Sequence, residues 1–289
     1  MRQEIIDLYD EFTHRGMERR AFMQRLAELA GGTAAAAAVL PLLEANSAKA
    51  AMIPADDGRV KGMRAAVPGP AGEVNGYLAM PASPPGKLPA VIVVHENRGL
   101  NGHIEDVARR AALAGFVAFA PDFLSRSGGT PSDQDQARDM IGKLDPDGVV
   151  ADARAVLAFL EKHEATNGKV GIVGFCWGGA VVSRVAAAAP ELDAGVVFYG
   201  RAPAAETVPN IKAPLLLNYA GKDDGVNGGI PGFREALDKA GVRYELHMYE
   251  GSQHAFHNDT SEARYDPAAA KLAWERTVAF FQRTLAGTA

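Results

Sequence analysis

The sequence predicts an α/β protein, with a mostly parallel sheet covered by helices on both faces. Two observations lead to this fold class. Short, continuously apolar runs rich in β-branched residues recur along the chain, which is typical of strands buried on both faces. Segments with helical spacing of apolar residues separate these runs through short connections, as in parallel α/β sheets. With 289 residues, of which 47% are hydrophobic, we expect one large domain over residues 51–289.

The predicted elements follow one another in regular alternation. An early strand at 74–80 is expected to join one edge of the sheet, and a more alternating one at 244–249 is expected to lie near an edge. The buried strands between them are predicted at 91–94, 116–120, 170–173, 195–199 and 215–219. Helices are predicted at 104–114, 148–162, 180–189, 231–240 and 267–285. Residues 124–147 are weakly patterned, which makes this insertion a candidate lid.

The first 50 residues differ from the rest and allow two interpretations. Twin arginines at Arg19-Arg20 precede an uncharged, alanine-rich stretch at 29–43 and a small-x-small site at Ala48-Lys49-Ala50. This order resembles a twin-arginine export signal, which would place the protein in the periplasm. Residues 1–25, however, carry five acids as well as five arginines, whereas the leading region of a signal is normally net positive.

The alternative is a helical arm that stays with the protein, which would then be cytoplasmic. Ile5, Leu8, Tyr9 and Phe12 follow the i, i+3, i+4, i+7 spacing of an amphipathic helix. Such a stripe docks on the body of the chain or on a second subunit, so a homo-oligomer formed through this arm is possible. Both interpretations remain open from the sequence.

Composition excludes several classes of protein. The chain has 30 basic and 35 acidic side chains, for a net charge of −5, and therefore lacks the basic excess of a nucleic-acid binder. Its one cysteine, Cys176, rules out an intramolecular disulfide and any multi-cysteine metal site. No apolar run reaches the ~20 residues that span a bilayer, and no motif for a phosphate or a metal cofactor is evident. We expect no cofactor.

Cys176 lies in a motif that explains why it is there. The segment Gly174-Phe175-Cys176-Trp177-Gly178-Gly179 follows a predicted strand and precedes a predicted helix. This is the G-x-nucleophile-x-G elbow in its strand–turn–helix context, with cysteine in place of the commoner serine. The turn is tight, so the residues two before and two after the nucleophile must be small. The following helix N-terminus favours a developing anion, whereas a buried structural cysteine would not require flanking glycines.

The elbow predicts an acid and then a histidine further along the chain. Asp223 and Asp224 follow the strand at 215–219, and we prefer Asp223 from its distance to the strand end. His254 follows the strand at 244–249, where the general base of such a site is expected, and His257 is its chief rival.

These motifs resemble the dienelactone hydrolase family of the α/β-hydrolase superfamily, whose activity is also called carboxymethylenebutenolidase. The resemblance covers about residues 60–286, and its matching segments are 94–99, 120–123, 174–179, 219–223 and 251–256. It implies the α/β-hydrolase fold and a catalytic triad of Cys176, Asp223 and His254.

The resemblance also implies roles for residues around the triad. Glu96 matches a carboxylate that contacts the resting thiol, and the backbone N–H groups of Asn97 and Trp177 match an oxyanion hole. Arg126 matches an arginine that holds a substrate carboxylate. The family's best-known members have a second arginine soon after the histidine, where this chain has residues 256–259 without one.

The missing arginine leaves the substrate open, although Arg98 or Arg201 would be able to replace it. We expect a hydrolase that cleaves lactones or carboxylic esters through an acyl-thioester on Cys176, acting on a small molecule. A general carboxylesterase or thioesterase with the same triad is the alternative within this mechanism. A non-catalytic binding protein of the same fold is the alternative outside it. We expect no catalytic group within the first 50 residues.

Overall fold

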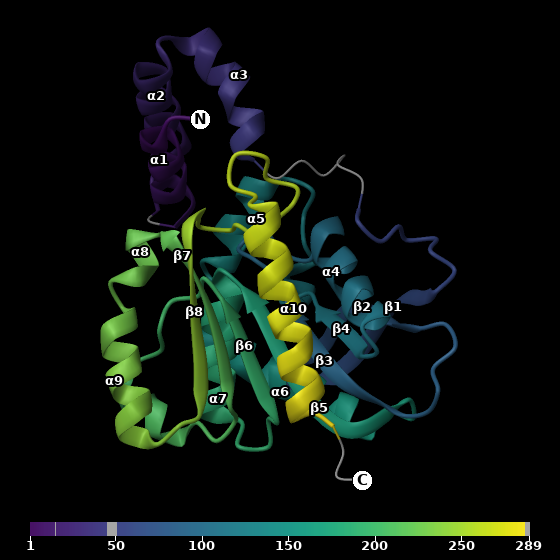
Figure 1. Ribbon diagram of the computed structural model, residues 1–289. Coiled ribbons are helices and arrows are strands. Elements are labelled where there is room, and N and C mark those ends of the chain that lie inside the picture. The colour runs from purple at the N-terminus through teal and green to yellow at the C-terminus, as the bar shows by residue number, and fades with distance from the viewer. Residues whose placement is uncertain (15, 45–50, 287–289) are drawn as a thin grey trace.

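The computed structural model describes residues 1–14, 16–44 and 51–286, and its body is built on one eight-stranded sheet (Figure 1). The strand order is β1-β2-β4-β3-β5-β6-β7-β8. The strands are β1 (Val60–Gly69), β2 (Gly72–Pro81), β3 (Leu88–Val94), β4 (Val117–Pro121), β5 (Thr166–Phe175), β6 (Ala194–Phe198), β7 (Leu215–Lys222) and β8 (Tyr244–Gln253). β2 pairs antiparallel with both β1 and β4, and every pair from β4 to β8 is parallel.

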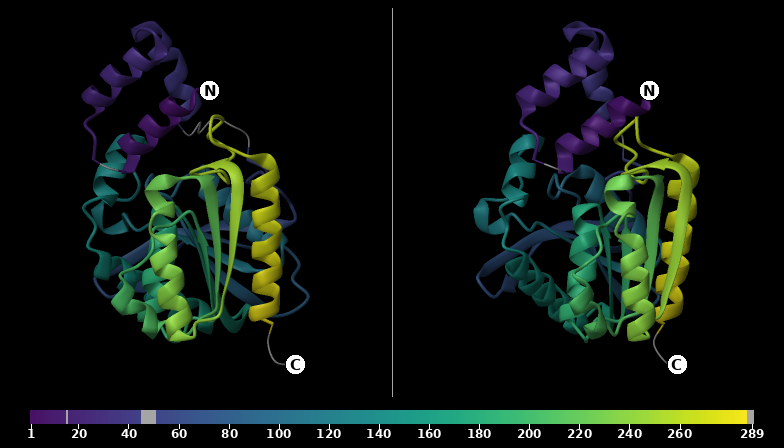
Figure 2. Two further views of the ribbon diagram at one scale, coloured as in Figure 1. Left: turned by 60° about the vertical axis from the view of Figure 1, so that its left-hand side comes forward. Right: turned by 90° about the vertical axis from the view of Figure 1, so that its left-hand side faces the viewer.

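Helices cover both faces of this sheet, as the sequence predicts (Figure 2). Side chains of α4 (Gly102–Leu113) and α10 (Pro267–Thr284) join one apolar core. Side chains of α6 (Pro146–Lys162), α7 (Trp177–Ala188) and α9 (Ile230–Ala240) join the other. A parallel sheet buried on both faces needs apolar residues at successive positions, which is why the central strands read as unbroken apolar runs.

Local sequence signals set where the covering helices begin. The Asp145 side chain accepts hydrogen bonds from the first turn of α6, and Pro146 follows it at the first helical position. Asp266 and Pro267 repeat this arrangement at the start of α10. The carboxylate satisfies N–H groups that have no partner inside the helix, and proline lacks the N–H that would be wasted there.

Two elements differ from the sequence prediction. The early strand expected at the edge of the sheet is β2, but β2 is the second strand from that edge. The edge itself is β1, which the sequence analysis missed. Most β1 side chains are exposed, so the strand carries no apolar pattern that would reveal it. The weakly patterned insertion contains a helix, α5 (Gln134–Ile141), whose N-terminus is capped by the Asp133 side chain. The prediction that β8 lies at an edge is confirmed.

The N-terminal segment forms three helices that stand above the carboxyl ends of the parallel strands (Figures 1 and 2). They are α1 (Gln3–His14), α2 (Arg19–Ala30) and α3 (Thr33–Leu43), and we call residues 1–43 the arm. The arm has an apolar core of its own, in which the Phe12 and Phe22 rings stack with centroids 4.3 Å apart. The predicted helical stripe of Ile5, Leu8, Tyr9 and Phe12 is buried.

The arm is tied to the body by polar contacts. Arg19 forms an ion pair with Asp135 at the start of α5. The Ala263 N–H and the Ser261 hydroxyl donate to the carbonyls of Leu42 and Leu43 at 3.0 and 3.1 Å. Because the same chain covers the apolar stripe of α1, no second subunit is needed to bury it, and an oligomer formed through the arm stays a prediction.

Within the described residues, no single helix has the length and apolarity to cross a membrane. The pair α2 and α3, bent by 109°, meets that test together by length and composition only. The predicted small-x-small site at 48–50 lies outside the described residues.

A buried ion pair holds the segment that follows β8 against α4. Asp259 lies 2.8 Å from His103 Nδ1 and 2.7 Å from the Arg110 guanidinium. Burial alone would raise the pKa of Asp259, but the hydrogen bond and charge of His103 and the charge of Arg110 outweigh it and lower the pKa.

We therefore expect Asp259→Asn to lower the free energy of unfolding by about 1.5–3 kcal/mol at neutral pH. An aspartate with a depressed pKa stabilises the fold above its unfolded value, ~3.9, and this contribution disappears as the pH falls through the folded pKa. Denaturant unfolding at pH 7 and at successively lower pH measures the effect. Asp139→Asn, which removes an exposed partner of Arg138, is the control and is expected to change stability by less than ~1 kcal/mol. Equal losses in the two variants would contradict the prediction.

Candidate active site

Cys176 occupies a strained turn between β5 and α7. Its φ of 55° lies in the left-handed region that few non-glycine residues adopt. Its N–H donates to the Phe198 carbonyl of β6 at 3.0 Å, which anchors the turn to the sheet. The sulfur therefore stands at the carboxyl edge of the sheet, in front of the N-terminus of α7.

The glycines around Cys176 are required by space. A Cβ on Gly174 would lie 2.2 Å from the carbonyl oxygen of Gly178, and one on Gly178 would lie 2.5 Å from that of His95. Both contacts are with backbone, which cannot rotate away. This packing confirms the prediction that these positions must be small.

The structure brings Asp223 and His254 to Cys176. Asp223 Oδ2 lies 2.6 Å from His254 Nδ1, and a ring nitrogen of His254 lies within 4.8 Å of Cys176 Sγ. The ring nitrogen that does not face Asp223, His254 Nε2, is buried and has no hydrogen-bond partner. Asp224 is exposed at the start of the short helix α8 (Asp224–Asn227). His257 is buried elsewhere, stacked on Phe175 at 4.9 Å.

The charges of this group determine the protonation of His254. Burial by itself would lower the pKa of the imidazole. The charges of Asp223 and Cys176, together with the interactions of both side chains with the ring, outweigh burial and raise the pKa of His254 well above its ordinary value.

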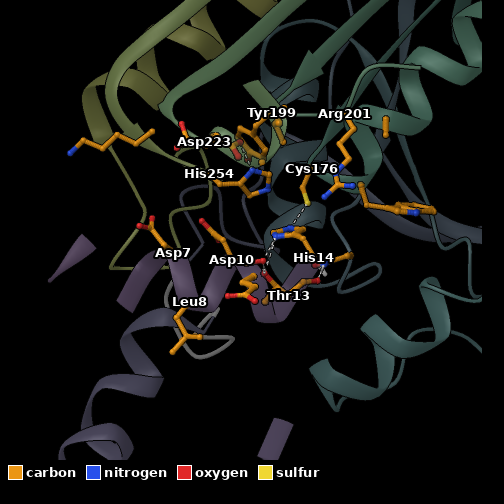
Figure 3. Close-up of a pocket in the computed structure, with 18 of the residues that line it drawn as sticks. Asp7, Leu8, Asp10, Thr13, His14, Cys176, Tyr199, Arg201, Asp223 and His254 are labelled. Atoms are coloured by element: carbon orange, nitrogen blue, oxygen red, sulfur yellow. Dashed lines mark hydrogen bonds and ion pairs between the residues drawn. The ribbon is translucent and has the colours of Figure 1, made fainter. Parts of the chain in front are cut away.

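A second histidine, which the sequence analysis did not place at the site, reaches the sulfur from the arm. His14 Nε2 lies 3.1 Å from Cys176 Sγ, and the His14 ring stands edge-on to His254 with centroids 4.5 Å apart (Figure 3). The expectation that the first 50 residues contribute no catalytic group stays a prediction, but the sequence did not predict this contact with the sulfur. The amphipathic stripe indicated that this helix docks, but nothing in the sequence indicated where.

Backbone contacts hold His14 in place. Its Nδ1 lies 2.9 Å from the carbonyl oxygen of Asp10, one helical turn earlier. The Asn97 side-chain amide donates to the Thr13 carbonyl at 2.9 Å, which fixes the end of α1 to the loop after β3. Burial and the charge of His254 lower the pKa of His14 well below its ordinary value, so this imidazole is neutral and offers a lone pair.

Glu96 is buried beside the site but is bonded to other groups. Its two carboxylate oxygens accept hydrogen bonds from the Asn258 amide at 2.7 Å and from the Tyr199 hydroxyl at 3.4 Å. Among the hydrogen bonds of the described residues, the side-chain partner of Cys176 Sγ is His14 rather than Glu96. No hydrogen bond between Glu96 and the Cys176 sulfur is present among the described residues, so the predicted contact stays a prediction.

The two residues predicted to supply oxyanion donors both lie at the cavity wall. Asn97 follows β3 and Trp177 is the first residue of α7. The N–H groups in the first turn of a helix have no partner inside it, so the Trp177 N–H is suited to receive an anion from the cavity.

A cavity of about 1340 Å³ opens in front of Cys176, and α1 forms one of its walls (Figure 3). The arm contributes acidic side chains and Arg25 to the walls, and the body contributes both signs of charge. Charged residues on the walls are Glu4, Asp7, Asp10, Glu11, Arg25, Arg138, Arg184, Arg201, Lys222, Asp223 and Asp224.

The arginines of the sequence prediction fall in different places. Arg126 is not among the residues that line this cavity, because its turn directs it to α6, where it pairs with Asp152. This position does not support the predicted contact with a substrate carboxylate. Arg98 is buried and pairs with Asp135 at 3.1 Å. Arg201 does line the cavity (Figure 3).

Arg264, which the sequence analysis missed, is a further buried cation near the site. Its guanidinium lies 3.4 Å from Asp10 and over the Tyr9 ring at 5.0 Å, so it binds α1 to the segment before α10. It lies ten residues beyond His254, outside the stretch in which a second arginine was sought.

A cysteine elbow after β5, an acid after β7 and a histidine after β8 define a hydrolase of the α/β-hydrolase fold. The chain belongs to the dienelactone hydrolase family, whose model matches residues 74–285, and it is a hydrolase enzyme. A non-catalytic binding protein is therefore disfavoured.

Curated relatives and solved structures agree with this family. A Salmonella typhi protein provisionally named a carboxymethylenebutenolidase is 30% identical over 245 residues, covering 80% of this chain and 90% of the relative. A Bradyrhizobium protein provisionally named a 2-oxo-3-(5-oxofuran-2-ylidene)propanoate lactonase is 34% identical over 216 residues, covering 70% and 86%. A crystal structure from Klebsiella pneumoniae, provisionally named a dienelactone hydrolase, is 30% identical with a TM-score of 0.72, covering 78% and 99%.

The packing of the elbow predicts that Gly178→Ala disrupts it. The new Cβ would press on the backbone carbonyls of Val94 and His95, so we expect the free energy of unfolding to fall by about 1–3 kcal/mol and ester hydrolysis to fall with it. Gly232→Ala in α9 is the control, because a Cβ there meets nothing within 4 Å. The control is expected to gain about 0.5–1 kcal/mol. Thermal unfolding and hydrolysis rates measure both, and an undisturbed Gly178→Ala protein would refute this account of the elbow.

Proposed function

We propose that this enzyme hydrolyses lactone or carboxylic ester bonds with Cys176 as nucleophile, His254 as base and Asp223 as the group that orients it. The observation that carries the proposal is the 2.6 Å pair between His254 Nδ1 and Asp223, with the ring beside a cysteine in a strained elbow. The family and the lactonase name of the Bradyrhizobium relative support this substrate class.

The first half of the reaction forms an acyl-enzyme. The Cys176 thiolate attacks the carbonyl carbon, and the electron pair of the C=O bond moves to oxygen. The backbone N–H groups of Asn97 and Trp177 bind this oxyanion, and such donors typically contribute ~3 kcal/mol each. When the tetrahedral intermediate collapses, the C–O bond to the alkoxide breaks and the His254 imidazolium protonates the leaving oxygen. In a lactone, that oxygen stays attached to the acyl chain.

The second half releases the acid. His254, now neutral, takes a proton from water as the water oxygen attacks the thioester carbonyl. The second tetrahedral intermediate expels the Cys176 thiolate, which restores the starting state. Asp223 keeps the imidazole in the orientation and tautomer that both steps require.

Substitutions at the nucleophile and the acid test this mechanism. We expect Cys176→Ala to abolish hydrolysis in a folded protein. Asp223→Asn is expected to lower kcat by a factor of roughly 10⁴, as in the analogous serine triad. Asp224→Asn, one residue away and exposed, is the matched control and is expected to lose far less. Turnover by folded Cys176→Ala, or the reverse ranking of the two aspartates, would overturn the assignment.

We further propose that Arg201, and not Arg126, binds the carboxylate of an acidic lactone. Arg201 lines the cavity that holds Cys176, whereas Arg126 pairs with Asp152 outside it. The cavity also carries acids from α1, so we expect neutral esters to be turned over with kcat/KM within roughly a hundredfold of an acidic lactone. This relaxed preference keeps a general carboxylesterase or thioesterase as the alternative.

Arg201→Ala is expected to lower kcat/KM for a carboxylate-bearing lactone by about ten- to hundredfold, the value of one charged hydrogen bond, and to spare a neutral ester. Arg126→Ala is the control and is expected to affect the two substrates alike. A selective loss in Arg126→Ala would return the role to that residue.

We also propose that the arm stays attached to the working enzyme. Its contacts with Asn97 and Arg264, and the wall it adds to the cavity, support a retained arm over a removed export signal. A cytoplasmic enzyme is the simpler consequence of this arrangement.

A further inference from the structure

Three side chains from distant parts of the chain meet at the head of the cavity. His14 ends α1, Cys176 opens α7, and His254 follows β8 (Figure 3). One ring nitrogen of each histidine and the Cys176 sulfur all lie within 4.8 Å of one another. The mechanism proposed above uses Cys176 and His254 but gives His14 no step.

We propose that His14, Cys176 and His254 form a binding site for a zinc-class divalent cation, which reversibly switches the enzyme off. The inhibition rests on the proposed function, whereas the binding itself does not. Two imidazoles and a thiolate are the ligand types that Zn²⁺ and related metals select, and hard cations such as Mg²⁺ and Ca²⁺ avoid them.

The spacing of the three atoms suits such an ion. Zinc–sulfur bonds of about 2.3 Å and zinc–nitrogen bonds of about 2.0–2.1 Å, at tetrahedral angles, place ligand atoms about 3.3–3.6 Å apart. His14 Nε2 and Cys176 Sγ are 3.1 Å apart, and the third atom lies within 4.8 Å of both. Side-chain shifts on the order of an ångström would therefore complete the coordination.

In a metal-binding histidine, the ring nitrogen that does not touch the metal usually bonds to a carboxylate or a carbonyl oxygen. Both histidines here have such a partner. His254 Nδ1 pairs with the Asp223 carboxylate at 2.6 Å, and His14 Nδ1 lies 2.9 Å from the Asp10 carbonyl oxygen. Such partners fix the tautomer and direct the other ring nitrogen to the metal. The remaining ring nitrogen of His254, Nε2, is buried and has no hydrogen-bond partner. An unsatisfied buried nitrogen in this position is an independent sign of a ligand.

The arm holds the third ligand in place, and the cavity provides an entry path. Asn97 bonds to the Thr13 carbonyl, and Arg264 pairs with Asp10 one turn before His14. The cavity of about 1340 Å³ reaches all three ligands and leaves a fourth position for water. The positive charges of Arg264 and Arg201 near the site oppose a cation, and the negative charges of Asp10 and Asp223 offset them.

Binding has defined chemical consequences. Zinc-class metals bind a thiolate and neutral imidazoles, so the protons that these ligand atoms hold are released as the cation binds. The sulfur electron pair is then donated to the metal and cannot attack a carbonyl carbon. His254 Nε2 is also occupied and cannot accept a proton from water. A chelator restores activity because no covalent bond to carbon has formed.

The test is titration of the full-length, metal-free protein with Co²⁺, whose thiolate complexes give a near-ultraviolet charge-transfer absorption. We expect this band in the wild type, its displacement by Zn²⁺, and no competition from Mg²⁺. Cys176→Ser is expected to lose the band. His14→Gln is expected to lower Co²⁺ affinity at least about tenfold. His247→Gln, on β8 beside Glu245, is the control and is expected to bind as the wild type does.

The outcomes separate this proposal from the proposed function. Absence of the thiolate band in wild-type protein would overturn the site, whatever the variants do. A band of unchanged affinity in His14→Gln would overturn it as well, since Cys176 and His254 alone would then account for binding. Ester hydrolysis by the metal-free wild type is measured in parallel. If hydrolysis is absent while the band behaves as expected, the proposed function fails and the metal site stands.

Discussion

The left-handed backbone at Cys176 is the constraint on which the site depends. A residue with φ of 55° is held there only because the surrounding structure leaves no alternative. The Cys176 N–H is bonded to β6, and the neighbouring glycines pack against backbone carbonyls on both sides. These contacts require β3, β5 and β6 to lie side by side in the sheet, so the apolar core that aligns the strands also positions the sulfur.

The second determinant is the edge of the sheet at which the loops meet. The parallel strands β5, β7 and β8 all end at the same edge, and their following loops supply Cys176, Asp223 and His254. The segment beyond His254 is held by Asp259, through its contact with His103 and its ion pair with Arg110 of α4. The imidazole is thus positioned by a strand on one side and a buried ion pair on the other.

The arm adds a layer that the α/β body lacks. Its apolar core is built mainly from its own helices, and polar side chains connect it to the body: Arg19 with Asp135, Arg264 with Asp10, and Asn97 with the Thr13 carbonyl. Polar contacts of this kind fix orientation while contributing little net stability. They place a neutral imidazole against the sulfur and enclose the cavity from above.

The sequence alone determined the α/β class and the elbow, and it predicted the order of nucleophile, acid and histidine. Unbroken apolar strands and the spacing of glycines are local patterns, imposed by burial on both faces and by a tight turn. The preference for Asp223 and His254 over Asp224 and His257 also followed from distance to a strand end, and the tertiary structure brings the preferred pair together.

Only the tertiary structure decided where the arm lies and which cations face the cavity. The apolar stripe on α1 indicated that the helix packs against another surface. Because apolar burial is non-directional, the stripe does not specify which surface that is. His14, Arg264 and Arg201 reach the site across long stretches of chain, and Arg126 turns away to pair with Asp152. The sequence did not predict β1 for a related reason, because this exposed edge strand is held by pairing with β2 and not by an apolar core. Contacts between distant segments depend on the folded path of the whole chain, which no local pattern encodes.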